Sequence, residues 1–459
     1  MLRGRGTLSR VGVQEGSFEG PSFYEATTPI NRTLKTRVSS PSVDGEALSS
    51  EAMAAAPKVR APHPAIWMVL YFPFGALGGF ITIPLGFLAT KNGISIGDAA
   101  LLNVAQYLTS WMKWLWAPIV DITLTPKRWY VISTALSALF IVLMAAIPLV
   151  ASTLNVMLLV IATASLVNSV VGMAVEALMS QATAPEEVGR VSGWFQAGNL
   201  GGNGVGGGIA LILIQETGRS WIAGVLLGAL FLLCCVALYA VPTSAPHRAE
   251  GGALRAVREV VRDLWTMLKT KGGLLSAILC LMPVSTGAAQ GILVQSKVAE
   301  LWGATDWHVA LVQGLLAGGI TSVGCFVGGY LCNRMAPRTA YALIGVALAI
   351  IASGMAISPA TVKMYVVWSM TYSFGVGLAY AAFTAVVLSC MGAGSGATKY
   401  NTFASLSNFP LWWLGWVLGQ VAEKHGPRAM LLAEAGFGVL GIGIFAASVW
   451  RVRRSSLPA

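Results

Sequence analysis

Two rows of polar side chains run along otherwise apolar segments, and they are the residues best placed to bind a polar molecule. Within each row the residues recur every three or four positions, which places them on one face of a helix. The rows consist of Asn103, Gln106, Ser110 and Lys113, and of Ser192, Gln196, Asn199 and Asn203. Such amides can simply join neighbouring helices. Two long rows exceed what helix adhesion requires, so we expect a water-filled cavity that binds a polar solute.

Lys113 is the basic residue that lies well inside an apolar run, eight residues before Asp121. A lysine within a membrane costs at least about 2.5 kcal/mol on insertion scales, so its presence there indicates a functional site. The alternative is that its long side chain reaches the lipid headgroups. We expect Lys113 to bind a carboxylate or phosphate of the solute.

The equivalent region of the second half of the chain carries fewer polar residues. Asn401, Ser405 and Asn408 lie on one predicted helix, and Gln290 and Gln313 lie on two others. We therefore expect Gln290 and Asn408 to contribute to solute binding, while the polar part of the solute lies closer to the first half.

Two acids, Glu176 and Glu434, lie inside apolar runs. Glu176 lies near the end of its run, where a gating network with Arg128 or Arg190 is the favoured interpretation. The alternative is that this desolvated carboxylate exchanges protons. Glu434 has no polar row around it and is interpreted as a packing or outer-gate residue.

The composition identifies the environment of the chain. Of the 459 residues, 55% are hydrophobic and only 11% are charged, whereas soluble proteins carry about 25% charged residues. The 52 glycines fit closely packed membrane helices. In a membrane protein, a net charge of +11 reflects the excess of basic residues in cytoplasmic loops, so no nucleic-acid partner is expected. Neither paired cysteine ligands nor a phosphate-binding loop occurs, so we predict no enzyme activity, no metal and no cofactor.

Twelve apolar runs are long enough to span a membrane as helices. They cover residues 65–89, 99–120, 129–150, 154–178, 191–214, 221–241, 273–295, 308–331, 339–358, 362–390, 401–421 and 429–450. The sequence therefore predicts an all-α membrane protein with two bundles of six helices, 65–241 and 273–450.

Three polar segments flank and separate these bundles. Residues 1–64 are predicted to be a disordered cytoplasmic tail, or to remain untranslated if Met53 is the true start. The linker 242–272 contains an amphipathic helix over 253–268, which we expect to lie along the membrane surface. Residues 451–459 form a second cytoplasmic tail.

The basic residues predict the orientation. With both termini on the same side, fifteen lysines and arginines outside the N-terminal tail lie on that side, and six lie on the other. Because basic loops stay in the cytoplasm, both termini are predicted to be cytoplasmic.

The two six-helix halves are related by an internal repeat. Residues 93–101 resemble residues 303–311, Asp121 corresponds to Asn333, and Arg190 corresponds to Lys399. The offsets of 210, 212 and 209 residues agree closely, which indicates a duplicated unit. Parallel repeats of this kind are the plan of major facilitator transporters.

The turn segments of the repeat extend that resemblance. Gly329, Asn333, Arg334 and Arg338 resemble the superfamily's cytoplasmic G-x-x-x-D-R-x-G-R-[KR] loop, with Asn in place of Asp. The first-half copy retains Asp121 and the basic pair Lys127 and Arg128. An acid or amide at a helix end can accept hydrogen bonds that hold helices in one gating state. The predicted gating and coupling residues are Asp121, Arg128, Glu176, Arg190, Asn333, Arg334 and Arg338.

Two further segments resemble AmpG-type muropeptide permeases: 113–121 (KWLWAPIVD) and 185–202 (PEEVGRVSGWFQAGNLGG). The resemblance implies proton-coupled uptake from the periplasm to the cytoplasm across the bacterial inner membrane, but it does not by itself imply muropeptide specificity. Together with Lys113, it leads us to expect a polar, anionic solute that is muropeptide-like or a related small molecule, carried by a monomer. Its expected partners are the solute, protons and the lipid bilayer. An exporter with the same fold and a non-transporting membrane sensor remain the alternatives.

Overall fold

A computed structural model describes residues 62–94, 96–242, 253–293, 296–309, 311–312, 316–392 and 394–454. The chain divides into Met1–Lys58 and Val59–Ala459, and the description concerns the second unit. Its described residues form helices and contain no strand. The predicted tail over 1–64 lies almost entirely outside these residues.

The first six predicted spans are helices, several of which change pitch or break along their length. They are α2 (Ala65–Phe80) with its continuation α3 (Gly86–Lys91), α4 (Ile96–Trp111) with α5 (Ala117–Ile122), α6 (Pro126–Ala146), α7 (Leu154–Ala182), α8 (Val188–Gly204) with α9 (Ala210–Thr217), and α10 (Ser220–Cys234).

The second half has the same plan after the linker helix α11 (Ala253–Leu268). Its helices are α12 (Lys271–Leu281), α13 (Gln290–Leu293), α14 (Ser296–Ala299), α15 (Asp306–Val309), α16 (Ala317–Arg334), α17 (Pro337–Ile357), α18 (Val362–Met391) and α19 (Gly396–Arg453).

Eight helices of the described residues are long and apolar enough to cross a membrane. One of them, α19, contains two predicted spans, because Gly426 has φ 84° and ψ 168° and interrupts the helix between them. Pro427 follows at the start of the second segment, where its missing N–H does no harm. The all-helical membrane fold predicted from the apolar runs is therefore confirmed.

The predicted second span is not one continuous helix. The prediction that all four residues of the first polar row lie on one face of a single helix is therefore wrong for Lys113. After α4 the chain forms a 3-10 turn over Lys113–Leu115, and α5 begins at Ala117. Pro118 explains the break, because its ring conflicts with a carbonyl one turn earlier and it cannot donate a hydrogen bond. Lys113 consequently lies in the turn and does not continue the face of α4.

The predicted seventh span, 273–295, is also interrupted. Helix α12 ends at Leu281, the chain is non-helical from Met282 to Ala289, and α13 then resumes. Pro283 begins this break, and Ser285 and Gly287 have φ values of 58° and 65°. We call residues 282–289 the helix-7 break.

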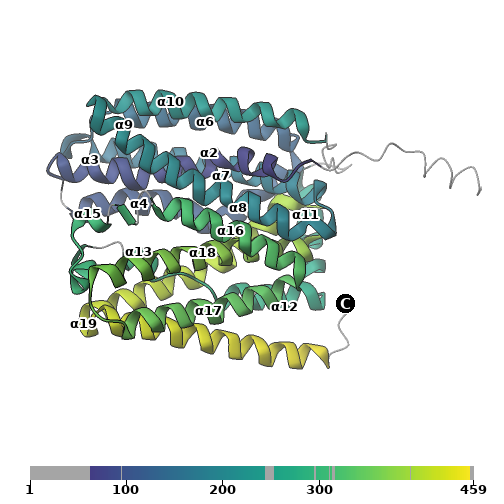
Figure 1. Ribbon diagram of the computed structural model, residues 1–459. Helices are drawn as coiled ribbons and strands as arrows, with labels where there is room; N and C mark the ends of the chain where they lie inside the picture. Colours follow the sequence, from purple (N-terminus) through teal and green to yellow (C-terminus); the bar gives the residue numbers. More distant parts are fainter. Residues whose placement is uncertain are drawn as a thin grey trace, which may run out of the picture. The chain divides into compact units, whose positions relative to one another are not determined.

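Helices of the two halves lie along a common direction, with α8 and α16 side by side between them (Figure 1). Glycines allow this close contact. A Cβ atom on Gly189 of α8 would lie 2.4 Å from the carbonyl oxygen of Gly329 in α16. The backbones of the two halves therefore meet where no side chain fits between them.

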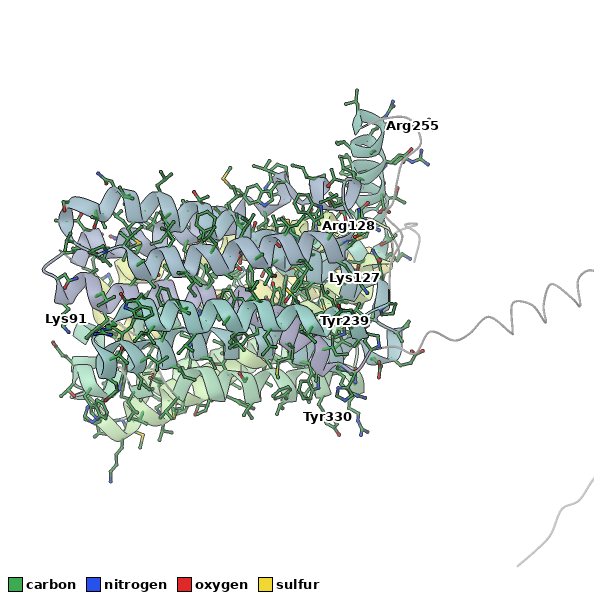
Figure 2. All side chains as sticks on the ribbon, turned by 90° about the horizontal axis from the view of Figure 1, so that it is seen from above. Lys91, Lys127, Arg128, Tyr239, Arg255 and Tyr330 are labelled. Carbon is green, nitrogen blue, oxygen red and sulfur yellow. The ribbon has the colours of Figure 1, made fainter. Side chains whose placement is uncertain are left out.

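One end of the bundle carries Lys127, Arg128 and Arg255, whereas Lys91 lies at the opposite end (Figure 2). We call the first the basic end. Helix α11 lies at this end and makes an angle of 88° with α12. Its exposed stripe of Leu254, Val261 and Trp265 fits a helix lying along a membrane surface.

Candidate substrate and gating site

Glu176 of α7 is fully buried and joins the two halves of the molecule. Its carboxylate accepts hydrogen bonds from the Tyr71 hydroxyl of α2 at 3.0 Å and from Asn401 Nδ2 of α19 at 2.7 Å. The prediction that Glu176 pairs with Arg128 or Arg190 is wrong, because both arginines are exposed at the basic end, whereas Glu176 is buried among uncharged donors.

Lys113 is buried, with 7% of its surface exposed, so it does not extend to the lipid headgroups. Its ammonium lies 4.3 Å from the ring centre of Phe74, a favourable cation–π arrangement. Phe74 stacks on Tyr71, which donates to Glu176. Lys113 also acts on Glu176 electrostatically. The structure thus brings together the buried lysine and the buried acid, which were predicted separately.

The second polar row forms another connection between the halves. Gln196 of α8 donates to the Thr384 hydroxyl of α18 at 2.8 Å, and this hydroxyl shares a hydrogen bond with Tyr400 at 2.9 Å. Asn199 donates to Gln196 at 3.0 Å. Gln196 therefore joins neighbouring helices, which is the alternative to solute binding for such rows of polar residues.

Several buried polar oxygens near these groups have no hydrogen-bond partner among the described residues. Two come from the first row, Asn103 Oδ1 and Gln106 Oε1, and one is Asn401 Oδ1 beside Glu176. Gln106 and Asn203 both approach Gly78 of α2, which brings the two rows together. Buried acceptors of this kind are usually satisfied by water or a ligand.

The remaining predicted binding residues are more scattered. Gln290 donates to Ser373 Oγ at 3.3 Å, far along the second half, and Asn408 is half-buried on α19. The side chains of Ser110 and Gln313 lie outside the described residues. The predicted water-filled cavity remains a prediction.

Asp121 lies at the end of α5, near the basic end, and contacts the second half. Its carboxylate accepts hydrogen bonds from the backbone N–H groups of Ala397 at 3.1 Å and Thr398 at 2.8 Å, and from the Thr398 hydroxyl at 2.7 Å. Burial raises the pKa of the Asp121 carboxyl, while these hydrogen bonds oppose the rise. A carboxylate at the N-terminus of α19 satisfies free N–H groups and interacts favourably with the helix dipole.

The repeat produces a corresponding contact at the same end, in which the side chain comes from the second half and the helix start from the first. Asn333 Oδ1, at the end of α16, accepts a hydrogen bond from the backbone N–H of Arg190 in the first turn of α8 at 3.3 Å. Each half therefore offers a side-chain oxygen to the start of a helix in the other half. The asparagine version is longer and uncharged, so it is the weaker of the two.

A third contact at the basic end was not predicted from the sequence. Asp263 of the linker helix α11 forms an ion pair with Lys399 of α19 at 2.9 Å, and its carboxylate also accepts the backbone N–H of Ser395 at 3.0 Å. Lys399 is almost fully buried and donates to the Met391 carbonyl. The internal repeat was the available signal for Lys399, because Lys399 is the position equivalent to Arg190, which is a predicted gating residue.

The other predicted gating residues lie at the basic end but contact different partners. Arg128 is exposed, and its backbone N–H donates to Thr125. Arg334 stacks on Tyr330, and Arg338 donates to the Gly272 carbonyl at 3.0 Å. Arg190 pairs with Glu187 across the surface of its own helix.

These contacts distribute the polar groups over two levels. Lys113, Glu176 and Asn401 lie inside the bundle. At the basic end, the contacts of Asp121 and Asn333 join the two halves, and Asp263 joins the linker helix to the second half. The inner groups comprise one basic, one acidic and one amide side chain, and the contacts of Asp121 and Asn333 must break before the halves can separate at the basic end. This is the arrangement that alternating access requires.

The comparisons with known proteins agree with this architecture. The family model of the Major Facilitator Superfamily matches residues 67–419. The crystal structure of the E. coli fucose:proton symporter superposes with a TM-score of 0.62 at 17% identity, covering 86% of this chain and 98% of the symporter.

A bacterial homologue of the iron transporter ferroportin, in its outward-facing state, superposes with a TM-score of 0.60 at 15% identity, covering 85% of this chain and 100% of that one. No curated protein matches the chain at a significant level. The family match and the helical membrane fold of the described residues show that the protein is a membrane transporter rather than an enzyme. It belongs to the Major Facilitator Superfamily.

Proposed function

We propose that this protein is a proton-coupled transporter that takes up a polar, anionic, muropeptide-like solute across the bacterial inner membrane by alternating access. The observation that carries the proposal is the buried set of Lys113, Glu176 and Asn401. Their burial makes a purely structural role costly, because charged groups inside a membrane are expensive to maintain.

Charge balance supports coupling to protons. Lys113 and Glu176 together are close to neutral, so an incoming anion that binds Lys113 leaves one uncompensated negative charge. A proton on Glu176 restores neutrality within the low-dielectric interior. One proton would accordingly accompany one singly charged anion.

The contact between Glu176 and Asn401 links this chemistry to the gate. Asn401 lies only one turn after Thr398, whose backbone and hydroxyl bind Asp121. Protonation of Glu176 weakens a charge-assisted hydrogen bond between the halves and thereby favours separation at the basic end. We place that end in the cytoplasm, with both termini, and treat the monomer as the transporting unit.

The muropeptide class rests on the resemblance of residues 113–121 and 185–202 to AmpG-type permeases. The unpaired oxygens of Asn103, Gln106 and Asn401 are compatible with a muropeptide, because a sugar–peptide offers hydroxyl and amide donors to such acceptors.

A ligand screen on purified protein tests the proposal. Thermal unfolding should be compared with muropeptides, short peptides, neutral sugars and acyl-CoA compounds, for the wild type and Lys113→Ala. We expect muropeptides to raise the melting temperature of the wild type and not of the variant. Stabilisation by neutral sugars that is equal in both proteins would contradict an anionic substrate bound at Lys113.

A further inference from the structure

The helix-7 break places polar backbone and hydroxyl groups inside the second half, away from Lys113 and Glu176. Non-helical backbone within a membrane is tolerated where protein groups or a bound ion satisfy it. Some groups of the break are satisfied: the Tyr341 hydroxyl donates to the Val284 carbonyl at 2.9 Å, and Ser285 Oγ donates to the Tyr341 carbonyl at 3.1 Å. Hydrogen bonds with Tyr341 of α17 thus stabilise the non-helical conformation of the break.

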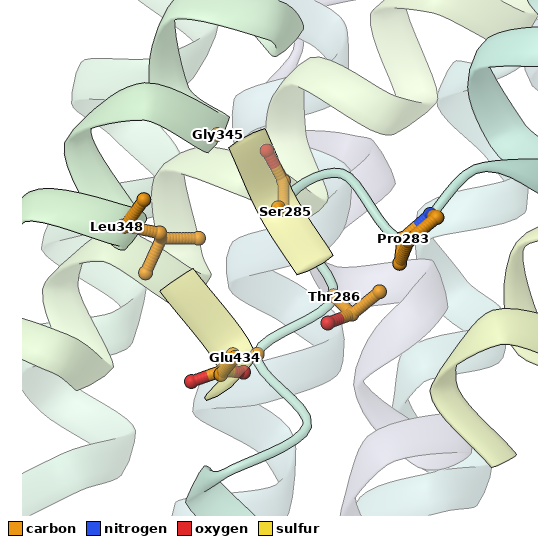
Figure 3. A pocket seen from close by; sticks show the side chains of 9 residues that line it. Pro283, Ser285, Thr286, Gly345, Leu348 and Glu434 are labelled. Carbon is orange, nitrogen blue, oxygen red and sulfur yellow. The ribbon is translucent and has the colours of Figure 1, made fainter. Parts of the chain in front are cut away.

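Glu434 of α19 faces this break, as Figure 3 shows. Its carboxylate accepts the backbone N–H of Ala289 at 3.1 Å, and both of its oxygens lie within 2.8 Å of the Tyr372 hydroxyl of α18. Only 9% of its surface is exposed. Of the two sequence-based interpretations of Glu434, a packing residue does not account for these polar contacts, and the outer-gate role remains a prediction.

A small hollow, about the size of one water molecule, lies between Glu434 and the break. Pro283, Ser285 and Thr286 line it from the break, and Gly345 of α17 and Gly438 of α19 line it from the facing helices. The two glycines leave space where side chains would otherwise fill it. The hollow is therefore suited to a single small ion.

The charges around the hollow are unbalanced. Glu434 takes part in none of the ion pairs between described residues. Among the described residues, the Tyr372 hydroxyl of α18 donates to Glu434, the Tyr341 hydroxyl of α17 donates to the Val284 carbonyl of the break, and residues 282–290 contain no titratable side chain. Tyrosine is uncharged below about pH 10. When Glu434 is ionised, the site consequently carries one negative charge, which a monovalent cation would neutralise.

We propose that Glu434, the hydroxyls of Ser285 and Thr286, and the backbone of the helix-7 break bind one monovalent cation, either a sodium ion or a proton. Non-helical segments inside transporters supply carbonyl ligands of this kind. A divalent ion would require more carboxylates, and the described residues contain no cluster of three metal-binding side chains. The inference rests on the proposed function in that the cation would serve as a coupling ion, separate from the proton on Glu176.

Thermal unfolding of the purified protein, without solute, tests this site. In the first arm, sodium chloride replaces choline chloride at constant ionic strength and pH 7.5. In the second arm, choline chloride is kept and the pH is varied from 5 to 8. Wild type is compared with Glu434→Gln, with Ser285→Gly, and with Glu423→Gln, which changes an exposed acid on the same helix.

If sodium is the ion, saturating sodium should raise the wild-type melting temperature by about 5 °C. The shift should disappear in Glu434→Gln, decrease in Ser285→Gly and persist in Glu423→Gln. If the ion is a proton, sodium has no effect, and the pH dependence of wild-type stability differs from that of Glu434→Gln.

Ser285→Gly keeps the test decisive if Glu434→Gln fails to fold, because glycine suits the positive φ of residue 285 and only the hydroxyl is lost. Responses to sodium and pH that are the same in wild type, Ser285→Gly and any folded Glu434→Gln would overturn the proposal. Because no solute is present, this result is independent of whether Lys113 binds an anion.

Discussion

Asp121 and Thr398 join the two halves of the protein at its basic end, with the Asp121 carboxylate accepting both the backbone N–H of Thr398 at 2.8 Å and its hydroxyl at 2.7 Å. This contact places a negative charge at the N-terminus of α19, where the helix dipole favours it. The halves cannot separate here without exposing those donors.

Asp121→Asn should open the basic end more often. The amide keeps one acceptor but loses the charge, so a contact worth about 1.5–3 kcal/mol is weakened. We expect roughly tenfold faster labelling of a cysteine at Ser405 by a membrane-impermeant reagent, in a background without the six native cysteines, and slower transport. Glu186→Gln, an exposed acid at the same end, is the control.

Because the sequence predicts a gating role for Arg334, Arg334→Ala is expected to impair transport, as Asp121→Asn does. Among the described residues, Arg334 stacks on Tyr330 of its own helix and not on a residue of the other half, so a smaller effect is expected. Unchanged uptake by both Asp121→Asn and Arg334→Ala, with normal membrane insertion, would contradict the assignment of a gate to the basic end.

Gly189→Ala tests the close contact of the halves independently of charge. The new methyl group would lie 2.4 Å from the Gly329 carbonyl and 2.5 Å from Asn333 Oδ1, so α8 and α16 must move apart. We expect faster labelling of the cysteine at 405, as for Asp121→Asn. Gly319→Ala is the matched control, because nothing lies within 4 Å of a Cβ there, and an equal effect of both changes would contradict the steric explanation.

The ion pair of Asp263 and Lys399 predicts an asymmetric pair of effects on stability. Asp263→Ala leaves a buried ammonium without its nearest carboxylate, whereas Lys399→Met leaves an acid that is partly exposed to water. We expect Asp263→Ala to lower the melting temperature more than Lys399→Met does, and the double variant to recover part of the loss. Strictly additive losses would mean that the pair contributes no coupling.

The helical architecture was predictable from local properties of the sequence. Apolar runs of about 20 residues predict membrane helices because the bilayer sets their length, and the offset between Asp121 and Asn333 indicates a repeat. The structure places these two residues in equivalent contacts, each at the start of a helix in the opposite half.

The interruptions were harder to predict, because hydropathy does not register backbone breaks. Pro118 and Pro283 were available signals, but a proline within a membrane helix can also be accommodated by neighbouring groups. The partners of Glu176 and Asp263 depend on how helices far apart in the sequence meet. Nothing local to Glu176 distinguishes Asn401 from the arginines at the basic end as its partner.

Lys113→Ala should lower the affinity for the anionic solute about tenfold or more, since it removes a charge-assisted bond of about 1.5–3 kcal/mol. Lys113→Arg keeps the charge with a different geometry and should recover part of the loss. Asn199→Ala, which removes a donor to Gln196, should change the preference among solutes. Binding competition with labelled muropeptide measures all three, and wild-type affinity in Lys113→Ala would place this lysine outside the substrate path.

The proposed role of Glu176 as the carrier of the proton that drives uptake is tested most directly in reconstituted liposomes. Glu176→Gln keeps an acceptor for Tyr71 but cannot exchange a proton. With an imposed pH gradient, the wild type should accumulate muropeptide above its external concentration. The variant should not accumulate it, yet should still exchange labelled for unlabelled solute, since exchange moves no net proton. Accumulation at the wild-type level in Glu176→Gln would contradict the account.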